Sequence, residues 1–484
     1  MRHNRDGEQK LFNLFGLFSL FFFLATSLFG ESFADFKRVQ SASFSQYKDK
    51  RDNAFNSYIK TQWQEYRAYI SPTMYKKPKP QKIVPLKEKA LPKAGPFVVI
   101  KVPKQKPSEV EPKPSKKEKH KGALAFDFFG VNVGFSLDKK IADIAFYPQN
   151  QAGIANFFSL LASSDYERTI EELQRYKKDL YLNDWGLYLL VTKLSKKLYG
   201  DRDRANIYAW FLFNKLHYDV KIALSERKRV YLLHYLEDTL YATPRYLFGS
   251  KYYYLISAYN IKYIEKIYTY KKSYPEAERA LDFSLKKLPK FPKDMLFKER
   301  TFSDYGKKYT FSYHYNKNIV AFMQTYPQVN YRIYFNAPLE SITYTELLKD
   351  IKKYTDGKKM SEAINFVLRF VQKAFRYERD QEQFGKEKVM FAEETLVYDA
   401  SDCEDRAVLF SYLIEKIFGI SAVGVKYSDH MSTALHIPMQ GDSIMVGRRR
   451  YVMADPTYIN ANIGQEIPKY RAAKPEYFIH LSNN

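Results

Sequence analysis

Three residues near the C-terminal end of the chain could together perform thiol chemistry. Cys403 is the only cysteine among the 484 residues, so any thiol reaction of this chain must use it. It follows Ser401-Asp402 and precedes apolar residues at helical spacing, which predicts that the thiol lies at a helix N-terminus. Unpaired backbone amides and the helix dipole favour a reactive thiolate there. The acidic residues around it oppose this effect, so a nucleophilic Cys403 needs a histidine partner.

Two short stretches that follow this helix supply a histidine and an aspartate. His430 opens the stretch HMSTALHIP and Asp455 lies near the end of RRRYVMADP, and both stretches have the pattern of strands. If the strands pair antiparallel with Ile437 opposite Arg448, then His430 lies opposite Asp455. Cysteine, histidine and aspartate would then serve as nucleophile, general base and the carboxylate that fixes the imidazole tautomer. His436, six residues along the same strand, is the alternative base, and we favour His430.

The chain resembles the exported bacterial members of the transglutaminase-like superfamily of papain-related thiol enzymes. Three stretches carry the resemblance, in the order DCEDRAVLFSYLIEKIFGI, YSDHMSTALHI and YVMADPTYINANIG, within about residues 360–465. It implies Cys403 as nucleophile, His430 as general base and acid, and Asp455 as the orienting residue. It also implies that the nucleophile helix packs on an antiparallel sheet. The chain departs from the family pattern at Met431, because members often have an aromatic residue after the histidine.

Donors for a developing oxyanion are less well defined by the sequence. Family members often use a Trp or Tyr upstream of the cysteine, which makes Tyr377 and Gln383 candidates, although both can equally be ordinary core and loop residues. The backbone amide of Cys403 is a further donor, because a helix terminus leaves it free. The sequence has no phosphate-binding loop, dinucleotide fingerprint, HExxH motif or calcium loop, so we expect no cofactor and no metal.

The N-terminus has the pattern of an export segment. Arg2, Arg5 and Lys10 precede an apolar run over 11–30, and Ser32-Phe33-Ala34 offers a small-x-small cleavage site. The run is also long enough for an uncleaved inner-membrane anchor. We therefore expect an exported chain that is periplasmic, or anchored in the inner membrane and facing the periplasm. Its net charge of +24 suits anionic neighbours such as lipid head groups or wall polymers, and export argues against nucleic acid as the main partner.

A segment rich in lysine and proline follows the N-terminal part of the chain. Residues 76–122 contain fifteen lysines, four acidic residues and nine prolines. Proline lacks a backbone donor and like charges repel, so we predict an extended, exposed and disordered linker. It is either a solvated spacer or a site of electrostatic attachment to an anionic envelope surface.

The remaining patterns predict an α+β protein with a C-terminal transglutaminase-like (papain-like) domain. Alternating aromatic residues, among them Tyr331, Ile333 and Phe335, predict strands in the middle of the chain. The expected parts are a signal peptide or membrane anchor at 1–34, a short helical element at 35–75, the disordered linker at 76–122, an α/β domain at 123–250, a β-rich domain at 251–340 and the catalytic domain at 341–484.

The α/β domain contains sparse matches to the catalytic domain at a fixed offset. Asp203-Arg204-Ala205 matches Asp405-Arg406-Ala407, and Leu233-His234 matches Leu435-His436. This pattern suggests a degenerate, inactive duplicate over about 150–250, and a chance similarity of one helix and two strands is the alternative. The matched positions that replace the three catalytic residues are Asp201 for Cys403, Lys228 for His430 and Thr243 for Asp455.

Three functions are compatible with these residues. The first is hydrolysis of a peptide or amide bond through a Cys403 thioester, which makes the chain a cysteine peptidase or amidase acting on a protein or peptide. The second is transamidation, in which a lysine amine rather than water accepts the acyl group, so that the chain crosslinks proteins. The third is a non-catalytic periplasmic scaffold that retains the triad. We predict that Cys403 is a reactive thiol of low pKa in the folded protein, because the helix terminus and His430 both stabilise the thiolate. A blocked cleft would favour the scaffold.

Overall fold

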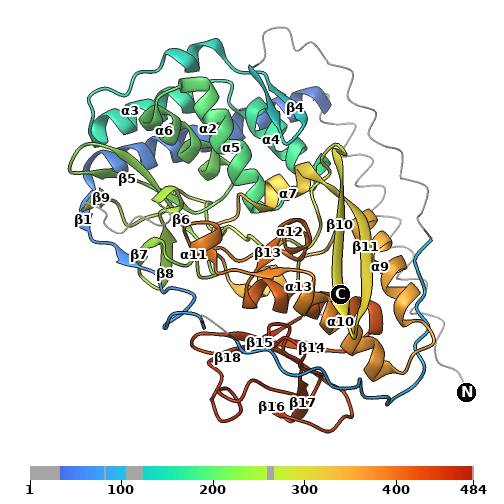
Figure 1. Ribbon diagram of the computed structural model, residues 1–484. Helices are drawn as coiled ribbons and strands as arrows, with labels where there is room; N and C mark the ends of the chain where they lie inside the picture. Colours follow the sequence, from blue (N-terminus) through green and yellow to red (C-terminus); the bar gives the residue numbers. More distant parts are fainter. Residues whose placement is uncertain (1–32, 81–82, 105–123, 259–265, 482–484) are drawn as a thin grey trace, which may run out of the picture. The chain divides into compact units, whose positions relative to one another are not determined.

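The computed structural model describes residues 33–80, 83–104, 124–258 and 266–481 (Figure 1). The chain divides into two compact units between Tyr58 and Ile59, and the first unit contains most of helix α2 (Phe33–Thr61). The predicted export segment lies outside the described residues except for its last two positions. Among the residues described, no helix is long and apolar enough to cross a membrane.

Four helices lie between residues 151 and 215 of the second unit. They follow a hairpin of two strands, β3 and β4, and a short 3-10 helix, η1. Side-chain oxygens of Asn150, Asn183 and Asp201 cap the starts of α3, α5 and α6. The bounds are β3 (Leu124–Phe128), β4 (Val131–Phe135), η1 (Lys139–Asp143), α3 (Gln151–Ala162), α4 (Glu167–Asp179), α5 (Asp184–Tyr199) and α6 (Arg202–Lys215).

A seven-stranded antiparallel sheet follows these helices in the order β1-β9-β5-β6-β8-β7-β2. Its strands are β1 (Gln64–Tyr66), β2 (Tyr69–Ile70), β5 (Val220–Ser225), β6 (Val230–Tyr235), β7 (Pro244–Phe248), β8 (Lys251–Tyr254) and β9 (Ile267–Thr269). Because β8 pairs with β6 and β9 pairs with β5, the predicted boundary between residues 250 and 251 is wrong. The helical element expected over 35–75 likewise ends at Thr61, and β1 and β2 join this sheet.

The predicted β-rich domain is divided between two parts of the fold. Its long hairpin, β10 and β11, bonds to α9, since the backbone amides of Ser312 and His314 donate to Asp350 and Glu346. The expected strand at Tyr331–Phe335 is wrong: this segment is helix α8, whose first turn is capped by the Asn330 side chain. The elements are η2 (Ile256–Ala258), β10 (Met295–Asp304), β11 (Lys307–Asn316), α7 (Lys317–Met323), α8 (Tyr331–Phe335), α9 (Ser341–Thr355) and α10 (Met360–Lys373).

The C-terminal part has a buried helix on a five-stranded antiparallel sheet of order β16-β17-β15-β14-β18. The helix α13 packs on β14 and β15, as expected for the helix that begins with Cys403. Preceding it are β12 (Arg376–Tyr377), α11 (Asp380–Gln383), α12 (Ala392–Val397) and β13 (Ala400–Ser401). The helix and sheet are α13 (Cys403–Phe418), β14 (Ala422–Lys426), β15 (Met431–Leu435), β16 (Ser443–Val446), β17 (Arg449–Met453) and β18 (Tyr477–His480).

The two sheets share one connectivity. Helix α6 is followed by β5 to β9 in the sheet order β9-β5-β6-β8-β7, and α13 is followed by β14 to β18 in the order β18-β14-β15-β17-β16. Each helix packs on the first two strands that follow it. This is the arrangement that a duplication requires, although it changes the predicted residue correspondence.

The shared connectivity shifts the positions that correspond to Cys403, His430 and Asp455. Asp201 and Asp402 are both helix N-caps, so Arg202, and not Asp201, takes the place of Cys403. Strand β17 corresponds to β8, whereas Thr243 directly precedes β7, so the predicted match of Thr243 with Asp455 is wrong.

The prediction of a disordered linker is wrong for residues 76–80 and 83–104, which lie extended on the protein. Backbone amides of this segment donate to carbonyls far along the chain, from Leu86 to Ile459 at 3.0 Å and from Val98 to Lys358 at 2.8 Å. Val98 and Ile100 are buried. The few apolar side chains among the lysines and prolines therefore find a surface to cover, which composition alone does not reveal. Residues 105–122 of the predicted linker lie outside the described residues.

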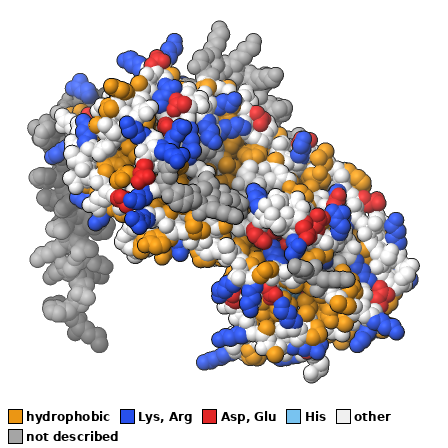
Figure 2. Space-filling view, turned by 60° about the vertical axis from the view of Figure 1, so that its left-hand side comes forward, with side chains coloured by type: hydrophobic (Ala, Val, Ile, Leu, Met, Phe, Trp, Pro, Cys, Tyr) orange, Lys and Arg blue, Asp and Glu red, His pale blue; other side chains and the backbone are white. Residues whose placement is uncertain are grey.

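Basic side chains are scattered on the face of the molecule shown in Figure 2, with acidic side chains between them.

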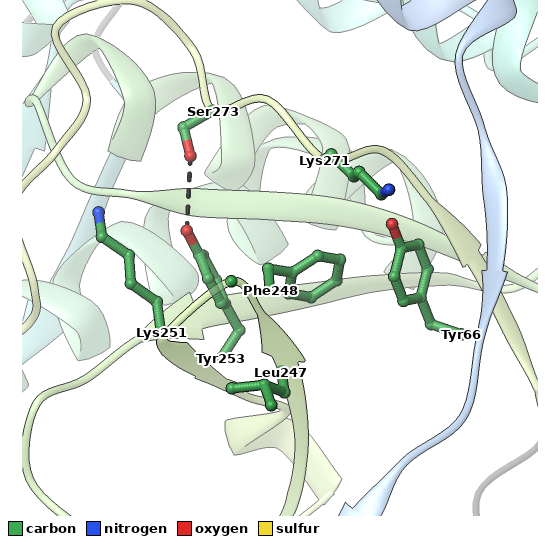
Figure 3. A pocket seen from close by; sticks show the side chains of 8 residues that line it. Tyr66, Leu247, Phe248, Lys251, Tyr253, Lys271 and Ser273 are labelled. Atoms are coloured by element: carbon green, nitrogen blue, oxygen red, sulfur yellow. Dashed lines mark hydrogen bonds between the residues drawn. The ribbon is translucent and has the colours of Figure 1, made fainter.

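The larger sheet also has a cavity of about 310 Å³, lined by Tyr66, Leu247, Phe248, Gly249, Lys251, Tyr253, Lys271 and Ser273 (Figure 3). Buried Asp219 accepts hydrogen bonds from the Tyr253 hydroxyl at 2.7 Å and from the Ser273 hydroxyl at 2.6 Å. Two polar groups of the wall thus share one buried carboxylate as their acceptor.

Candidate functional site

Cys403 is the first residue of α13 and is fully buried. The start of this helix is fixed by Asp405, whose carboxylate accepts hydrogen bonds from the backbone amides of Asp402 and Met390. Buried Arg406 ties the same turn to the end of α10 by donating to the carbonyls of Gln372 and Phe375. The position of the thiol is therefore determined by the helix terminus and by two charged side chains beneath it.

The structure brings His430 and Asp455 together as the sequence predicts. Nε2 of His430 lies 2.8 Å from Oδ2 of Asp455, and both side chains are fully buried. Strands β15 and β17 pair Ala434 with Met453, a register two residues away from the expected one. The two side chains still meet because His430 precedes β15 and Asp455 follows β17.

The surroundings of this pair determine which imidazole nitrogen is free. Asp455 Oδ1 accepts hydrogen bonds from the backbone amides of Thr457 at 2.8 Å and Tyr458 at 3.2 Å. An ionised carboxylate only accepts, so Nε2 of His430 carries the proton that it donates to Oδ2. Nδ1 is buried and has no hydrogen-bond partner in the part of the chain that the structure describes. Nδ1 of His430 therefore keeps a lone pair that can accept a proton.

Tyr470 covers one face of the His430 ring. Its ring stacks on the His430 ring with centroids 4.9 Å apart, and its hydroxyl donates to Asp429 at 3.0 Å. Burial and the Asp429 carboxylate raise the pKa of Tyr470, and the charge of a Cys403 thiolate adds to this effect.

The thiol itself is bonded elsewhere. Cys403 Sγ donates to Glu404 Oε2 at 3.2 Å and lies 3.6 Å from the Tyr75 hydroxyl, whereas no hydrogen bond joins it to His430 among the described residues. Burial raises the pKa of the Cys403 thiol well above its usual value, and the charges of Glu404 and Asp402 raise it further. The expectation of a low pKa is therefore wrong for this arrangement of the site.

A buried lysine from the N-terminal segment occupies the acidic group beside the thiol. Lys79 Nζ lies 2.5 Å from Asp402 Oδ2, 3.1 Å from Asp380 Oδ2 and 3.1 Å from Glu387 Oε2, and it also donates to Glu404. The other oxygen of Glu404 accepts from the Tyr75 hydroxyl at 2.8 Å. One carboxylate thus connects Lys79, Tyr75 and the thiol.

Burial and mutual charge determine how these groups titrate. Burial alone would disfavour the Glu404 carboxylate, but Lys79 and hydrogen bonds hold its pKa at about 2. Burial and neighbouring acids raise the pKa of Asp380 and of Asp402. Burial opposes the charge of Lys79, yet Asp402, Glu404 and Asp380 keep its pKa well above the usual value. The carboxylates are close enough to share a cation, and the Lys79 ammonium takes that place.

The two predicted oxyanion donors lie beside the segment that leads to Cys403. Tyr377 is opposite Ser401 in the β12–β13 pair, and its hydroxyl lies 3.4 Å from the Pro80 carbonyl. Burial, with the charge of Cys403, raises the pKa of Tyr377. Gln383 Nε2 donates to the Ala400 carbonyl at 3.4 Å, and its Oε1 is buried without a partner in the described part of the chain. Both side chains are thus close to the nucleophile helix.

The alternative base, His436, lies outside this constellation. It is exposed, and its Nδ1 contacts the Arg450 carbonyl at 3.1 Å. Sequence reasoning missed Tyr75, Lys79 and Asp380. A single lysine among fifteen in a proline-rich run carries no local signal, because its partners are distant in sequence.

Comparisons with known proteins give no further guide to this site. No protein-family model, curated protein or solved structure matches the chain. The transglutaminase-like resemblance rests on its three stretches and stays a proposal.

We expect Cys403 in the full-length native protein to react slowly with iodoacetamide, with an alkylation midpoint above the ~8.5 of a free thiol. Burial and the adjacent carboxylates favour the neutral thiol, so raising the pH should be needed to form the thiolate. Intact-mass measurement against pH reports this residue alone, because the chain has one cysteine. The protein unfolded in urea is the control and should show the ordinary midpoint. A native midpoint below ~8.5 would contradict the closed arrangement.

Proposed function

We propose that the chain is a transglutaminase-like thiol enzyme that transfers an acyl group through a thioester on Cys403, with hydrolysis of a peptide or amide bond as the net reaction. The observation that carries this proposal is the buried His430–Asp455 pair, whose 2.8 Å hydrogen bond leaves Nδ1 of His430 unpaired within the described structure. A buried base without a partner costs stability, which favours a chemical role over a structural one.

The proposed reaction has two steps. In the first, Cys403 Sγ attacks the substrate carbonyl carbon while its proton passes to Nδ1 of His430, and His430 then protonates the leaving amine. The backbone amide of Cys403, with Tyr377 or Gln383, donates to the oxyanion. In the second step, water attacks the thioester and gives its proton to His430, releasing the carboxylic acid and the thiol.

Transamidation is the second candidate, and Lys79 favours it. This lysine bonds to Glu404, which also accepts the hydrogen bond of the Cys403 thiol. A primary amine can therefore be accommodated close to the nucleophile. All three proposed catalytic residues are common to both reactions.

A non-catalytic scaffold is the third candidate. The Cys403 thiol is fully buried and bonded to Tyr75 and Glu404, so the cleft is blocked in this structure. The unpaired Nδ1 of His430 argues against this candidate, because a scaffold has no use for it.

We further infer that the part of the chain from α6 to β9 is a second copy of the catalytic helix and sheet without its triad. The shared strand order supports the duplication, and Arg202 at the thiol position has no nucleophilic role. This copy would act in packing or binding. The finer assignment of residues 341–484 as a transglutaminase-like domain belongs to the same proposal.

Export and envelope association complete the proposal. The basic and apolar pattern of residues 1–34 favours a periplasmic or inner-membrane-anchored protein, with a protein or peptide as substrate. The surplus of lysine over acidic residues in 76–122 favours contact with an anionic envelope surface.

Acylation by a small activated ester tests the enzymatic proposal. We expect p-nitrophenyl acetate to add one acetyl group to Cys403 slowly, because the thiol is buried, and the adduct to hydrolyse in the native protein. Intact-mass measurement follows both steps, and Cys403→Ser should form no thioester. An adduct that is as stable in the native protein as in the urea-unfolded one would show that no group of the fold catalyses its hydrolysis.

A further inference from the structure

The larger antiparallel sheet curls until its two edges lie close together. Strand β1 pairs with β9 at one edge and β2 pairs with β7 at the other, and two residues separate β1 from β2. Because consecutive Cα atoms are about 3.8 Å apart, the edges at Tyr66 and Tyr69 lie within about 11 Å of each other. The Tyr66 ring accordingly packs on the Phe248 ring of β7, with centroids 4.5 Å apart. The mouth of a sheet closed in this way is where β-barrels hold small ligands.

The cavity of about 310 Å³ lies at this place. Its lining includes the aromatic residues Tyr66, Phe248 and Tyr253 and the basic residues Lys251 and Lys271. Figure 3 shows the Phe248 ring between the side chains of Lys251 and Lys271. Lys271 is exposed, so the cavity reaches the surface. A cavity of this size is at the lower end of the range for sites that hold small organic molecules.

A third lysine lies behind the wall of the cavity. Lys221 is fully buried, and its Nζ donates to the Lys271 carbonyl at 2.8 Å and to the Ser273 hydroxyl at 3.1 Å. The same ammonium lies 5.0 Å from the centroid of the Tyr253 ring. Burial lowers the pKa of Lys221 to about 8, against the opposing charge of Asp219. An anion in the cavity would therefore stabilise the charged form of this lysine.

The one acid beside the cavity already has both of its oxygens in use. Asp219 Oδ2 accepts from Lys251 Nζ at 3.0 Å and from the Tyr253 hydroxyl, and Oδ1 accepts from the Ser273 hydroxyl. Within the described residues, Lys271 forms no ion pair. The cavity thus presents ring faces and an excess of positive charge. A neutral sugar would need free acceptors for its hydroxyl groups, whereas a carboxylate only accepts.

We propose that the mouth of the larger sheet binds an organic anion in which a carboxylate is joined to a ring. Lys271 and Lys251 hold the carboxylate, and Tyr66 and Phe248 pack against the ring. The ligand is either a small free acid or the C-terminal aromatic residue of a peptide. The sheet that lacks the triad thereby has a binding role. This proposal is independent of the proposed function, because binding requires no thiol chemistry.

Calorimetric titration of the full chain with phenylacetate tests the site. We expect saturable one-to-one binding with a Kd of about 1 mM or below, a range that ligands of this size reach. Phenylacetamide keeps the ring without the charge and acetate keeps the charge without the ring, so each should bind about tenfold more weakly. Equal binding of either analogue, or no saturable binding of phenylacetate, would overturn the proposal.

A pair of lysine variants locates the binding. Lys271→Met keeps the apolar stem, removes the ammonium that has no carboxylate partner, and should weaken phenylacetate binding about tenfold. Lys272→Met removes the same charge from the next exposed position, which does not line the cavity, and should leave the Kd unchanged. Because both side chains are exposed, neither change should prevent folding. An unchanged Kd in Lys271→Met, or an equal loss in both variants, would reject the assigned site.

A dipeptide distinguishes the two sources of the carboxylate. N-acetyl-alanyl-phenylalanine represents a peptide C-terminus, and its C-terminal amide is the neutral control. Binding of the dipeptide acid that weakens in Lys271→Met would assign the site to peptide C-termini, and binding of phenylacetate alone would assign it to small acids. Binding of the amide as tightly as the acid would contradict recognition of a carboxylate.

Discussion

His430→Ala is expected to slow hydrolysis of the Cys403 acetyl thioester by about 10²- to 10⁴-fold, the range that a positioned general base contributes. Nδ1 of His430 is the buried nitrogen left unpaired by the Asp455 bond, so no other base of the described site replaces it. The decay of the adduct by intact mass measures the effect. His436→Ala is the matched control, because that histidine is exposed and should leave the rate unchanged.

Asp455→Asn tests, by the same measurement, whether Asp455 fixes the tautomer of the His430 imidazole. The asparagine amide would turn its NH₂ group towards Nε2, because the Thr457 and Tyr458 amides keep the oxygen on the other side. Nε2 must then accept, and the proton moves to Nδ1, where it blocks the base. In serine proteases the equivalent change lowers turnover about 10⁴-fold. Asp201→Ala, at the corresponding helix cap of α6, should leave the rate unchanged, and equal losses in both variants would contradict the assignment.

Lys79→Met is expected to lower the free energy of unfolding by about 3–5 kcal/mol near neutral pH. Methionine keeps the apolar stem but leaves Asp380, Asp402 and Glu404 buried without their cation. Chemical denaturation measures the loss. Lys77→Met removes the same charge from an exposed position two residues away and should change stability by less than about 0.5 kcal/mol.

The loss should shrink as the pH falls. Asp380 and Asp402 have raised pKa values in the folded protein. Their contribution to stability therefore favours folding when the two acids are protonated, and it is lost as the pH rises through their pKa values in the folded state. Without Lys79 these pKa values rise further, and protonation removes the uncompensated charge. In the unsubstituted protein, the ionised Glu404 carboxylate stabilises the folded state at pH values above its ordinary pKa. This contribution is lost as the pH falls through about 2. If Lys79→Met lost as much unfolding free energy at about pH 5 as at about pH 8, the loss would come from packing and not from charge.

These two expectations concern different parts of one site. The histidine and aspartate come from the sheet, and the acidic group comes from α11 and the start of α13. Burial and the carboxylates of Glu404 and Asp402 keep the thiol neutral, and the Tyr75 hydroxyl lies against it. In the proposed function, a substrate must displace Tyr75 before His430 can act on Cys403.

Local sequence determined where several helices begin. The caps Asn150, Asn183 and Asp201 mark helix starts by their own side-chain hydrogen bonds, which depend on residues two or three positions away. The start of α13 at Cys403 follows from the same local rule. The approach of His430 to Asp455 was also predictable, because two neighbouring antiparallel strands bring their ends together.

Predictions that depended on pairing between strands were less accurate. The alternation of Tyr331, Ile333 and Phe335 resembles a strand, but a strand needs a partner, and the Asn330 cap starts a helix instead. The register of β15 on β17 differs by two residues from the expected one, a shift that keeps the same faces inward. Alternation fixes which face is buried, and it does not distinguish registers that differ by two.

Only the tertiary structure decided how the thiol is held. Lys79 meets Asp402 across 323 positions of sequence, and Tyr75 meets Cys403 across 328. Nothing local distinguishes this lysine from its neighbours in a basic, proline-rich run, since burial of a charge depends on carboxylates that the fold brings to it. The sequence alone thus determined the thiol, its helix and its histidine–aspartate pair, whereas long-range packing determined that the thiol is buried, neutral and covered by the chain's own lysine segment.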